Sequence, residues 1–336
     1  MNSNQHHHIE DCEYRVLRFV KAGGGEPPIK LGRAGQCRYC GTTDTRSFQT
    51  ISHAMPEALG NKWVTSLDEC DDCNRAFAPL DDALVKSIGA ALTVGGTPGK
   101  GNRVRQTGRS KGSSSIVHQR QDGRRHISMS TNGTPFGEQI GFDNLTGELV
   151  LRVPTGTERF IPALAYKALS KMGFALLPEE MLEEFTHLRQ WLSKDDDRIL
   201  PHMIAGLSFA SIGNAPRLLS GALLVRKLDD PNIPYMLFVM TIGSICFQIV
   251  MKTDRLDGEW PSQIRTRPSI KWANVLAPPG ETPIELRYGD PTHIDLGRNS
   301  LEPRLIETVD TRIKPGGKEA RMVMNIRQNS LAATLL

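Results

Sequence analysis

The sequence predicts an α+β fold in which a small cysteine-rich module precedes a larger α+β domain. Three observations lead to this prediction. Two Cys-x2-Cys pairs, Cys37 with Cys40 and Cys70 with Cys73, lie within one short stretch. Strand and hairpin patterns dominate from residue 116 onward. Two helical patterns lie among these strands, between residues 161 and 192.

Length and composition set the class of protein. A chain of 336 residues is long for a single core, so we expect two units. A hydrophobic content of 39% with 23% charged residues excludes a chain that is disordered throughout. The net charge of +4 leans weakly towards polyanionic partners. The N-terminal residues have no apolar core, so we expect no secretory signal there and interpret His6, His7 and His8 as part of a disordered polar tail.

The chain divides into five expected segments. In order, these are an N-terminal extension, the cysteine module, a basic Gly/Ser-rich linker, an α+β C-terminal domain and a polar, loosely packed tail: 1–34, 35–94, 95–115, 116–302 and 303–336. Residues 13–20 of the extension are expected to form a short strand or helix. The two cysteines outside the pairs, Cys12 and Cys246, suggest no disulfide framework, and the cysteine pattern favours a reducing cytoplasm.

The module is expected to contain one strand and one helix. Residues 47–52 alternate as a strand would, and His53 stands at its end. From Cys73 onward, apolar residues with helical spacing form a stripe that should face the cysteines: Phe77, Leu80, Leu84, Val85 and Ile88. Pro79 is expected to bend this helix or to restart it.

The linker changes composition abruptly. It carries five cations with no acidic residue among them: Lys100, Arg103, Arg105, Arg109 and Lys111. One interpretation is a flexible connection, and the other is a mobile basic arm that binds the phosphates of nucleic acid. Both interpretations remain open, and they are compatible.

The C-terminal domain is expected to begin with hairpins. Asp122-Gly123 and the segment 144–147 are the turn signals. An amphipathic helix over 161–176 and a second helix over 178–192 follow, and strands return at 222–228, 235–242 and 245–252. The apolar run 233–251 approaches the length of about 20 residues that a membrane span needs. Its interruption by Gly243 and Ser244 favours two buried strands joined by a tight turn.

Two Cys-x2-Cys pairs supply the four thiolates of a tetrahedral structural zinc site. Such a site has no open position for water or substrate, so any chemistry must come from residues beside it. His53 and Asn74 are so placed in the sequence. The structural alternatives are a histidine bonded to a backbone carbonyl and an asparagine that caps a helix.

Between the cysteine pairs stands His-x2-Pro-x2-Leu-Gly, and the second pair is followed directly by Asn and an aromatic residue three positions on. Over residues 35–89 this pattern resembles the HNH endonucleases of the ββα-metal class. The resemblance implies that His53 is a general base that activates water. It also implies that Asn74 binds one divalent cation, Mg²⁺ or Mn²⁺, which stabilises charge on the phosphate.

The sequence departs from that family in two places. The acidic cation ligand usual before the histidine is replaced by Ser52, so Ser52 or a nearby acid would have to take its place: Glu57, Asp68, Asp81 or Asp82. The middle asparagine that orients the base is not evident, and Asn61 is a stand-in at an unexpected spacing.

Two functional hypotheses follow. The first is a metal-dependent endonuclease that hydrolyses phosphodiester bonds of nucleic acid, with DNA as the expected substrate and restriction or anti-phage defence as its expected setting. The second is a non-catalytic zinc module that binds nucleic acid or a protein. Under either hypothesis we expect no membrane association, and the C-terminal domain would mediate any protein partner or homo-oligomer.

Overall fold

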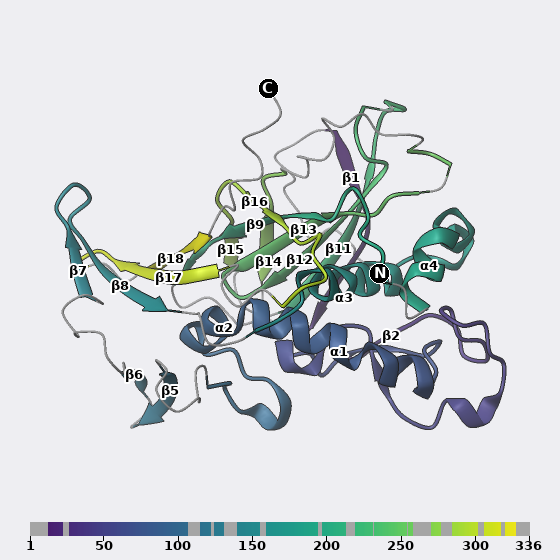
Figure 1. Cartoon of the computed structure of the whole chain (residues 1–336), viewed down its shortest axis with the longest axis horizontal. Helices are drawn as coiled ribbons and strands as arrows, with labels where there is room; N and C mark the ends of the chain where they lie inside the picture. Colours follow the sequence, from purple (N-terminus) through teal and green to yellow (C-terminus); the bar gives the residue numbers. More distant parts are fainter. Residues whose placement is uncertain are drawn as a thin grey trace.

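The computed structural model describes residues 13–22, 27–106, 115–121, 124–130, 140–154, 159–193, 197–212, 219–230, 232–253, 255–257, 270–276, 284–301, 306–316 and 320–326. This part of the chain combines helices with sheets, which confirms the predicted α+β class. Figure 1 shows the N-terminal module along one side of a large sheet, with helix α3 (Pro162–Ala175) between them.

The module contains two short antiparallel strands followed by a helix. Strands β3 (Ser52–His53) and β4 (Val64–Ser66) are antiparallel, and β2 (Ile29–Leu31) pairs parallel to the other edge of β4. Helix α1 (Asp71–Ser87) follows. It has two acidic residues in its first turn, where their negative charge interacts favourably with the helix dipole. The order β3, β4, α1 is the ββα arrangement predicted for this segment. Helix α2 (Gly89–Gly95) is the last element of the module.

Six antiparallel strands form the largest sheet, in the order β1-β11-β12-β13-β9-β16. Their bounds, in that order, are Tyr14–Ala22, Leu219–Arg226, Met236–Ile242, Ile245–Val250, Ile204–Phe209 and Thr292–Asp295. Leu223 packs on the face that α3 covers, whereas Ala222 and Leu224 pack with Trp272 on the other face. Both faces are therefore buried, which explains why these strands have continuous apolar sequences.

A second sheet of five strands has the order β10-β18-β17-β8-β7. Its bounds, in that order, are Ser211–Ile212, Ala320–Ile326, Ile306–Ile313, Glu148–Pro154 and Ile140–Asp143. Two separate two-stranded antiparallel sheets consist of β5 (Ser115–Gln121) with β6 (Arg124–Ser130), and of β14 (Ala273–Leu276) with β15 (Ile284–Arg287). The antiparallel pairing expected on either side of 122–123 is thus confirmed, although residues 122–123 themselves lie outside the described residues, and the hairpin around 144–147 is confirmed as well.

The apolar run 233–251 forms β12 and β13, whose turn contains Gly243 at a φ of 54°. This confirms the predicted buried hairpin. Within the described residues, no helix combines the length and the apolar character that crossing a bilayer requires.

Three expectations for the larger part of the chain are wrong in detail. The helix expected to be amphipathic, α3, has nearly all its side chains buried, because its polar residues Lys167 and Lys171 bind backbone carbonyls in the interior. The helix expected over 178–192 is a 3-10 turn, Glu179–Phe185, followed by α4 (Thr186–Ser193). The expected loose tail contributes β17 and β18, which pair with each other; β17 also pairs with β8, and β18 with β10.

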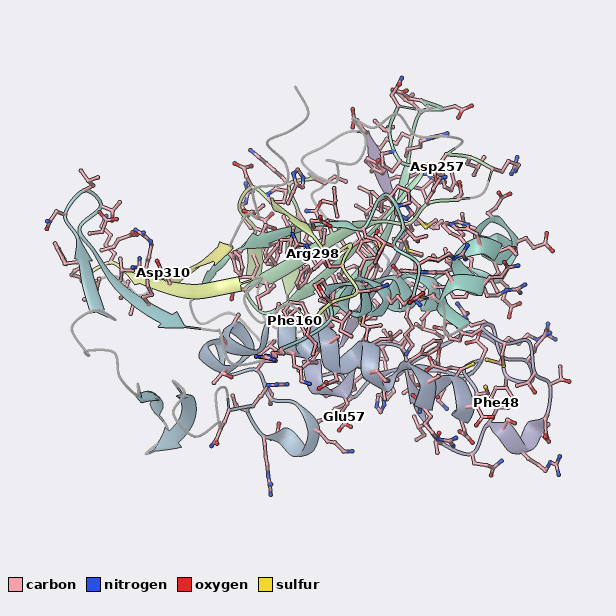
Figure 2. All side chains as sticks on the ribbon, viewed as in Figure 1. Phe48, Glu57, Phe160, Asp257, Arg298 and Asp310 are labelled. Atoms are coloured by element: carbon pink, nitrogen blue, oxygen red, sulfur yellow. The ribbon has the colours of Figure 1, made fainter. Side chains whose placement is uncertain are left out.

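One core connects the module to the large sheet. Phe77, Leu84 and Ile88 of the module belong to the same buried cluster as Leu169 of α3 and Phe238 of β12. Figure 2 shows side chains filling the region between the module and the large sheet. Strand β1, in the expected N-terminal extension, lies at the edge of the large sheet through its pairing with β11. The division into separate domains stays a prediction.

Candidate active site and metal centre

The four paired cysteines come together at the start of α1. The Sγ atoms of Cys37 and Cys73 are 3.8 Å apart, and those of Cys40 and Cys70 are 3.6 Å apart. All four lie within 4.8 Å of one another. Zinc–sulfur bonds of about 2.3 Å in a tetrahedron place sulfurs about 3.8 Å apart, so the donor set fits zinc in both chemistry and spacing.

Backbone hydrogen bonds shape the two knuckles. The Gly41 amide donates to the Cys37 carbonyl at 2.8 Å, and Gly41 has a φ of 79°, which favours glycine. The Arg38 amide donates to the Asp68 carbonyl at 2.8 Å and so joins the first knuckle to the segment before the second. Contact with the Cys73 thiol lowers the pKa of Cys37 to about 4. A thiolate, the form that binds a metal, is therefore accessible in the cluster.

His53 lies at the end of β3, opposite Thr65 of β4, and is half-buried. The strand is shorter than expected, because the Asp71 carboxylate accepts the amides of Gln49 and Thr50 that would otherwise extend it. Burial lowers the pKa of the His53 imidazole; the Glu57 carboxylate raises this pKa and the Lys171 ammonium lowers it. The thiol cluster contains no histidine from the described residues, so the imidazole stays outside the metal centre.

Ser52 points the other way from His53, because neighbouring strand residues face opposite sides. It is 1% exposed, and its hydroxyl donates to the Glu69 carbonyl at 3.2 Å. The geometry therefore gives Ser52 a structural hydrogen bond, and its role as a cation ligand stays a prediction.

Asn74 occupies the fourth position of α1, and its backbone amide donates to the Cys70 carbonyl at 2.9 Å. Cys70 is the N-cap of the helix. The alternative that Asn74 caps the helix is therefore wrong. Its half-exposed side chain makes no hydrogen bond with another described residue, which leaves its amide oxygen for a ligand.

Asn61 organises the loop that follows His53. Its amide nitrogen donates to the carbonyls of Met55 and Val64 at 2.7 and 2.8 Å. Its amide oxygen accepts the backbone N–H groups of Trp63 and Val64 at 3.1 and 2.9 Å. All four hydrogen-bonding positions of this fully buried side chain are used. The sequence indicated Asn61 only as a stand-in, because its spacing from His53 is unexpected.

The four acids considered as substitutes for a carboxylate at position 52 have different surroundings. Asp68 is buried against Arg38, and Asp82 pairs with Lys86 at 2.6 Å. Burial raises the pKa of Asp81, whose Oδ1 has no hydrogen-bond partner among the described residues. Glu57 is the acid whose charge acts on the pKa of His53.

Two buried cations tie the module to α3. The Arg38 guanidinium binds Asp68 and also donates to the carbonyls of Phe174, Ala175 and Leu177 at the end of α3. In the opposite direction, Lys171 of α3 donates to the His53 carbonyl at 3.0 Å. The module and the helix therefore each supply a charge to the other.

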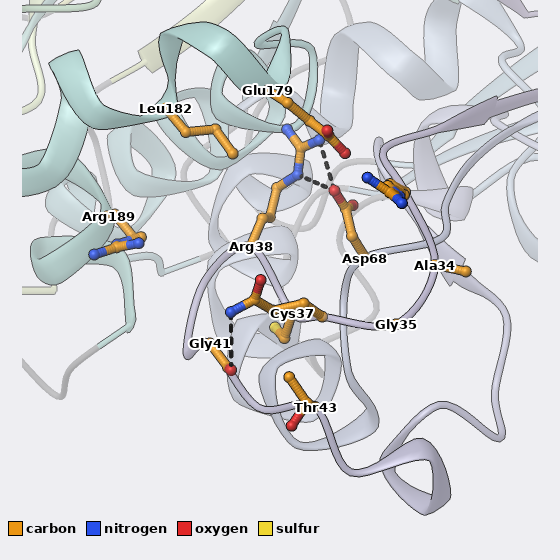
Figure 3. A pocket seen from close by; sticks show the side chains of 12 residues that line it. Ala34, Gly35, Cys37, Arg38, Gly41, Thr43, Asp68, Glu179, Leu182 and Arg189 are labelled. Carbon is orange, nitrogen blue, oxygen red and sulfur yellow. Dashed lines mark hydrogen bonds and ion pairs between the residues drawn. The ribbon is translucent and has the colours of Figure 1, made fainter.

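A hollow of about 530 Å³ opens beside the first knuckle. Figure 3 shows the residues around it: Arg38 and Asp68 from the module, Glu179 and Leu182 from the 3-10 turn, and Arg189 from α4. Arg33 also lines the hollow, and neither Arg33 nor Arg189 makes an ion pair with any described residue.

The described part of the expected linker is folded. The Gly99 amide donates to the Arg103 carbonyl, and the Thr93 hydroxyl donates to the Arg105 carbonyl at 3.0 Å. Lys100 and Arg103 are exposed and Arg105 is half-buried. The remaining predicted phosphate ligands, Arg109 and Lys111, lie outside the described residues.

Comparison with known families supports this reading of the geometry. Residues 37–88 match the family model described as HNH endonuclease. No curated protein and no solved structure matches the chain. The matched segment contains both knuckles, β3, β4 and the whole of α1. Residues 37–88 of this chain, called the HNH domain below, therefore match the HNH endonuclease family.

Proposed function

We propose that the chain is a metal-dependent endonuclease that hydrolyses phosphodiester bonds of nucleic acid. The observation that supports this most strongly is the separation of tasks within the HNH domain. Four thiols form a closed centre suited to structural zinc, and His53 stands outside that centre on the end of a strand. A histidine that is not needed for zinc can act on a proton.

The environment of His53 suits a general base. A base must be unprotonated at working pH, and burial lowers the pKa of this imidazole. His53 would accept a proton from the water that attacks the phosphorus. Asn61 would hold the loop behind it, because its four hydrogen bonds join Met55 to Val64 across that loop.

Asn74 is the residue that would hold a second, divalent cation. Its side-chain oxygen is a hard ligand of the kind that Mg²⁺ and Mn²⁺ prefer. Such a cation, when bound, stabilises negative charge on the phosphate and on the leaving oxygen. Zinc would remain with Cys37, Cys40, Cys70 and Cys73.

The substrate is proposed to be DNA. Exposed Lys100 and Arg103, together with the basic residues 109 and 111, supply positive charge next to the HNH domain in the sequence. Such charge favours phosphate backbones without selecting a base sequence. A role in restriction or anti-phage defence in the cytoplasm is proposed by analogy with the family alone.

A second candidate function is a non-catalytic zinc module that binds nucleic acid or a protein. The observation in its favour is Ser52, which is buried and hydrogen-bonded where the family usually places an acidic ligand.

A plasmid assay separates the two candidates. Supercoiled DNA is incubated with wild type, with His53→Ala and with His293→Ala, in Mg²⁺ and in Mn²⁺. His293 is an exposed histidine of β16 and serves as the matched control. The nuclease proposal expects nicking by wild type and by the control, and a loss of about 10²- to 10⁴-fold in His53→Ala. DNA binding without cleavage by all three proteins would support the second candidate.

A further inference from the structure

Helix α3 contributes a lysine to the back of the proposed catalytic strand. The Lys171 side chain is 1% exposed. Moving an ammonium out of water costs several kcal/mol unless partners compensate it. A buried lysine is therefore informative about what it binds.

The partners of Lys171 all belong to the HNH domain. Its Nζ donates to the carbonyl of His53 at 3.0 Å and lies 3.1 Å from Glu69 Oε2. It also lies 5.5 Å from the centre of the Phe77 ring, near enough for a cation–π contact. Glu69 itself precedes the second knuckle, and its backbone carbonyl accepts the Ser52 hydroxyl. One cation thus connects β3, the second knuckle and α1.

This contact acts on the residue that carries the imidazole. Strand β3 has only two residues, so few ladder hydrogen bonds hold it. A hydrogen bond to the His53 carbonyl restricts the peptide plane attached to the same Cα as the imidazole, and hence the direction of the Cα–Cβ bond from which the ring extends. The donor comes from residue 171, outside residues 37–88.

The reverse contact keeps α3 in place. Arg38 of the first knuckle binds the last carbonyls of α3, one turn beyond Lys171. The Tyr39 hydroxyl also donates to the Lys171 carbonyl at 3.4 Å. The helix that positions His53 is therefore itself held by the knuckle that binds the proposed zinc.

We propose that Lys171 is a positioning residue for His53, so that α3, outside the family match, completes the nuclease site. The proposal rests on the proposed function for its effect on cleavage. Its structural part, the orientation of the imidazole, does not depend on that function.

The helix offers a matched control. Lys167 lies one turn earlier on α3 and is also buried. Its Nζ donates to the Trp191 carbonyl at 3.1 Å and lies 4.7 Å from the centre of the Trp191 ring. Lys167→Met and Lys171→Met therefore each remove a buried ammonium that binds a backbone carbonyl and an aromatic ring. Only the second removes the contact with His53.

The first measurement follows the His53 ring directly. Full-length protein with zinc is labelled with ¹³C at the histidine Cε1, and the His53 signal is assigned by its loss in His53→Ala. We expect Lys171→Met to shift or broaden this signal and Lys167→Met to leave it in place. An unchanged His53 signal in Lys171→Met overturns the proposal, as does an equal change in both variants. If Lys171→Met does not fold, Lys171→Gln replaces it in the same comparison.

The second measurement separates positioning from binding. Single-turnover cleavage and DNA affinity are measured for both variants. A misplaced base is expected to slow cleavage by Lys171→Met about 10- to 100-fold, with the dissociation constant for DNA unchanged. Equal rates for both variants, or a loss that lies entirely in DNA affinity, would contradict the proposal. A wild type that cleaves no DNA would remove the proposed function, and the ring signal would still decide whether Lys171 positions His53.

Discussion

Replacing Arg38 with methionine should destabilise the whole chain, because this side chain joins the HNH domain to α3. Its guanidinium lies 2.7 Å from Asp68 Oδ2 through both Nε and Nη2, and the two side chains are 1% and 5% exposed. Nη1 donates to the carbonyls of Phe174 and Ala175 at 2.7 and 3.1 Å. Methionine retains an apolar stem of similar length, so the change removes mainly the charge and the hydrogen bonds.

The expected loss follows from these contacts. Removing one partner of a buried ion pair costs about 3–5 kcal/mol, because the other charge is left without compensation. Each buried carbonyl that loses its donor adds about 1 kcal/mol or more. A loss of about 5–7 kcal/mol is a large part of the roughly 5–15 kcal/mol by which proteins are stable. We therefore expect a much lower urea midpoint.

The assay is urea unfolding followed by tryptophan fluorescence, with zinc and a reductant present. Arg46→Met is the control, because Arg46 also pairs with an aspartate, Asp44, but on the surface. An exposed ion pair contributes little to stability, so the control should unfold at the same urea midpoint as wild type. If Arg38→Met also unfolds at the wild-type midpoint, the reasoning that the two parts are joined by this buried cation is refuted.

Three further predictions concern the loop, the metal and pH. Asn61→Ala should lower stability by about 3 kcal/mol or more, since it removes the partner of the Met55 carbonyl and of the Trp63 and Val64 amides, and should abolish nicking; a variant that nicks normally would show that the loop does not position His53. Wild type should contain one zinc per chain by elemental analysis and Cys70→Ser should lose it, whereas equal zinc in both would contradict the four-thiolate centre. His202 is buried, and burial lowers its pKa to about 3. Below its ordinary pKa of about 6.5, the unfolded chain therefore takes up a proton that the folded chain does not. As the pH falls from 7.5 to 5.5, this residue should lower the free energy of unfolding by about 1.4 kcal/mol. Urea midpoints at the two pH values should fall less in His202→Gln than in wild type, and parallel falls would contradict this assignment.

The sequence was sufficient for features that depend on local pattern. The apolar stripe from Phe77 to Ile88 predicted α1, and the Gly243-Ser244 interruption predicted the β12–β13 hairpin. The cysteine spacing predicted a cluster that the structure confirms. The helix expected to restart at Pro79 instead continues past it as one element, α1.

Features that depend on distant contacts could not be predicted. Lys171 looked like the polar side of an amphipathic helix, because its partner His53 is 118 residues away. Arg38 gave no sign of its contact with the end of α3, which is 136 residues away. The strands β17 and β18 were missed because polar residues such as Asp310 interrupt their apolar alternation. Asp310 itself is buried and pairs with Arg152 of β8.

The central claim is that His53 is the base of a nuclease whose zinc is held by thiols alone. Chemical rescue tests it most directly: His53→Gly is assayed for plasmid nicking in Mg²⁺ with increasing concentrations of imidazole. We expect the variant to be inactive alone and to regain nicking in proportion to neutral imidazole, since the added ring takes the place of the missing side chain. Nicking by His53→Gly at the wild-type rate without imidazole would contradict the claim.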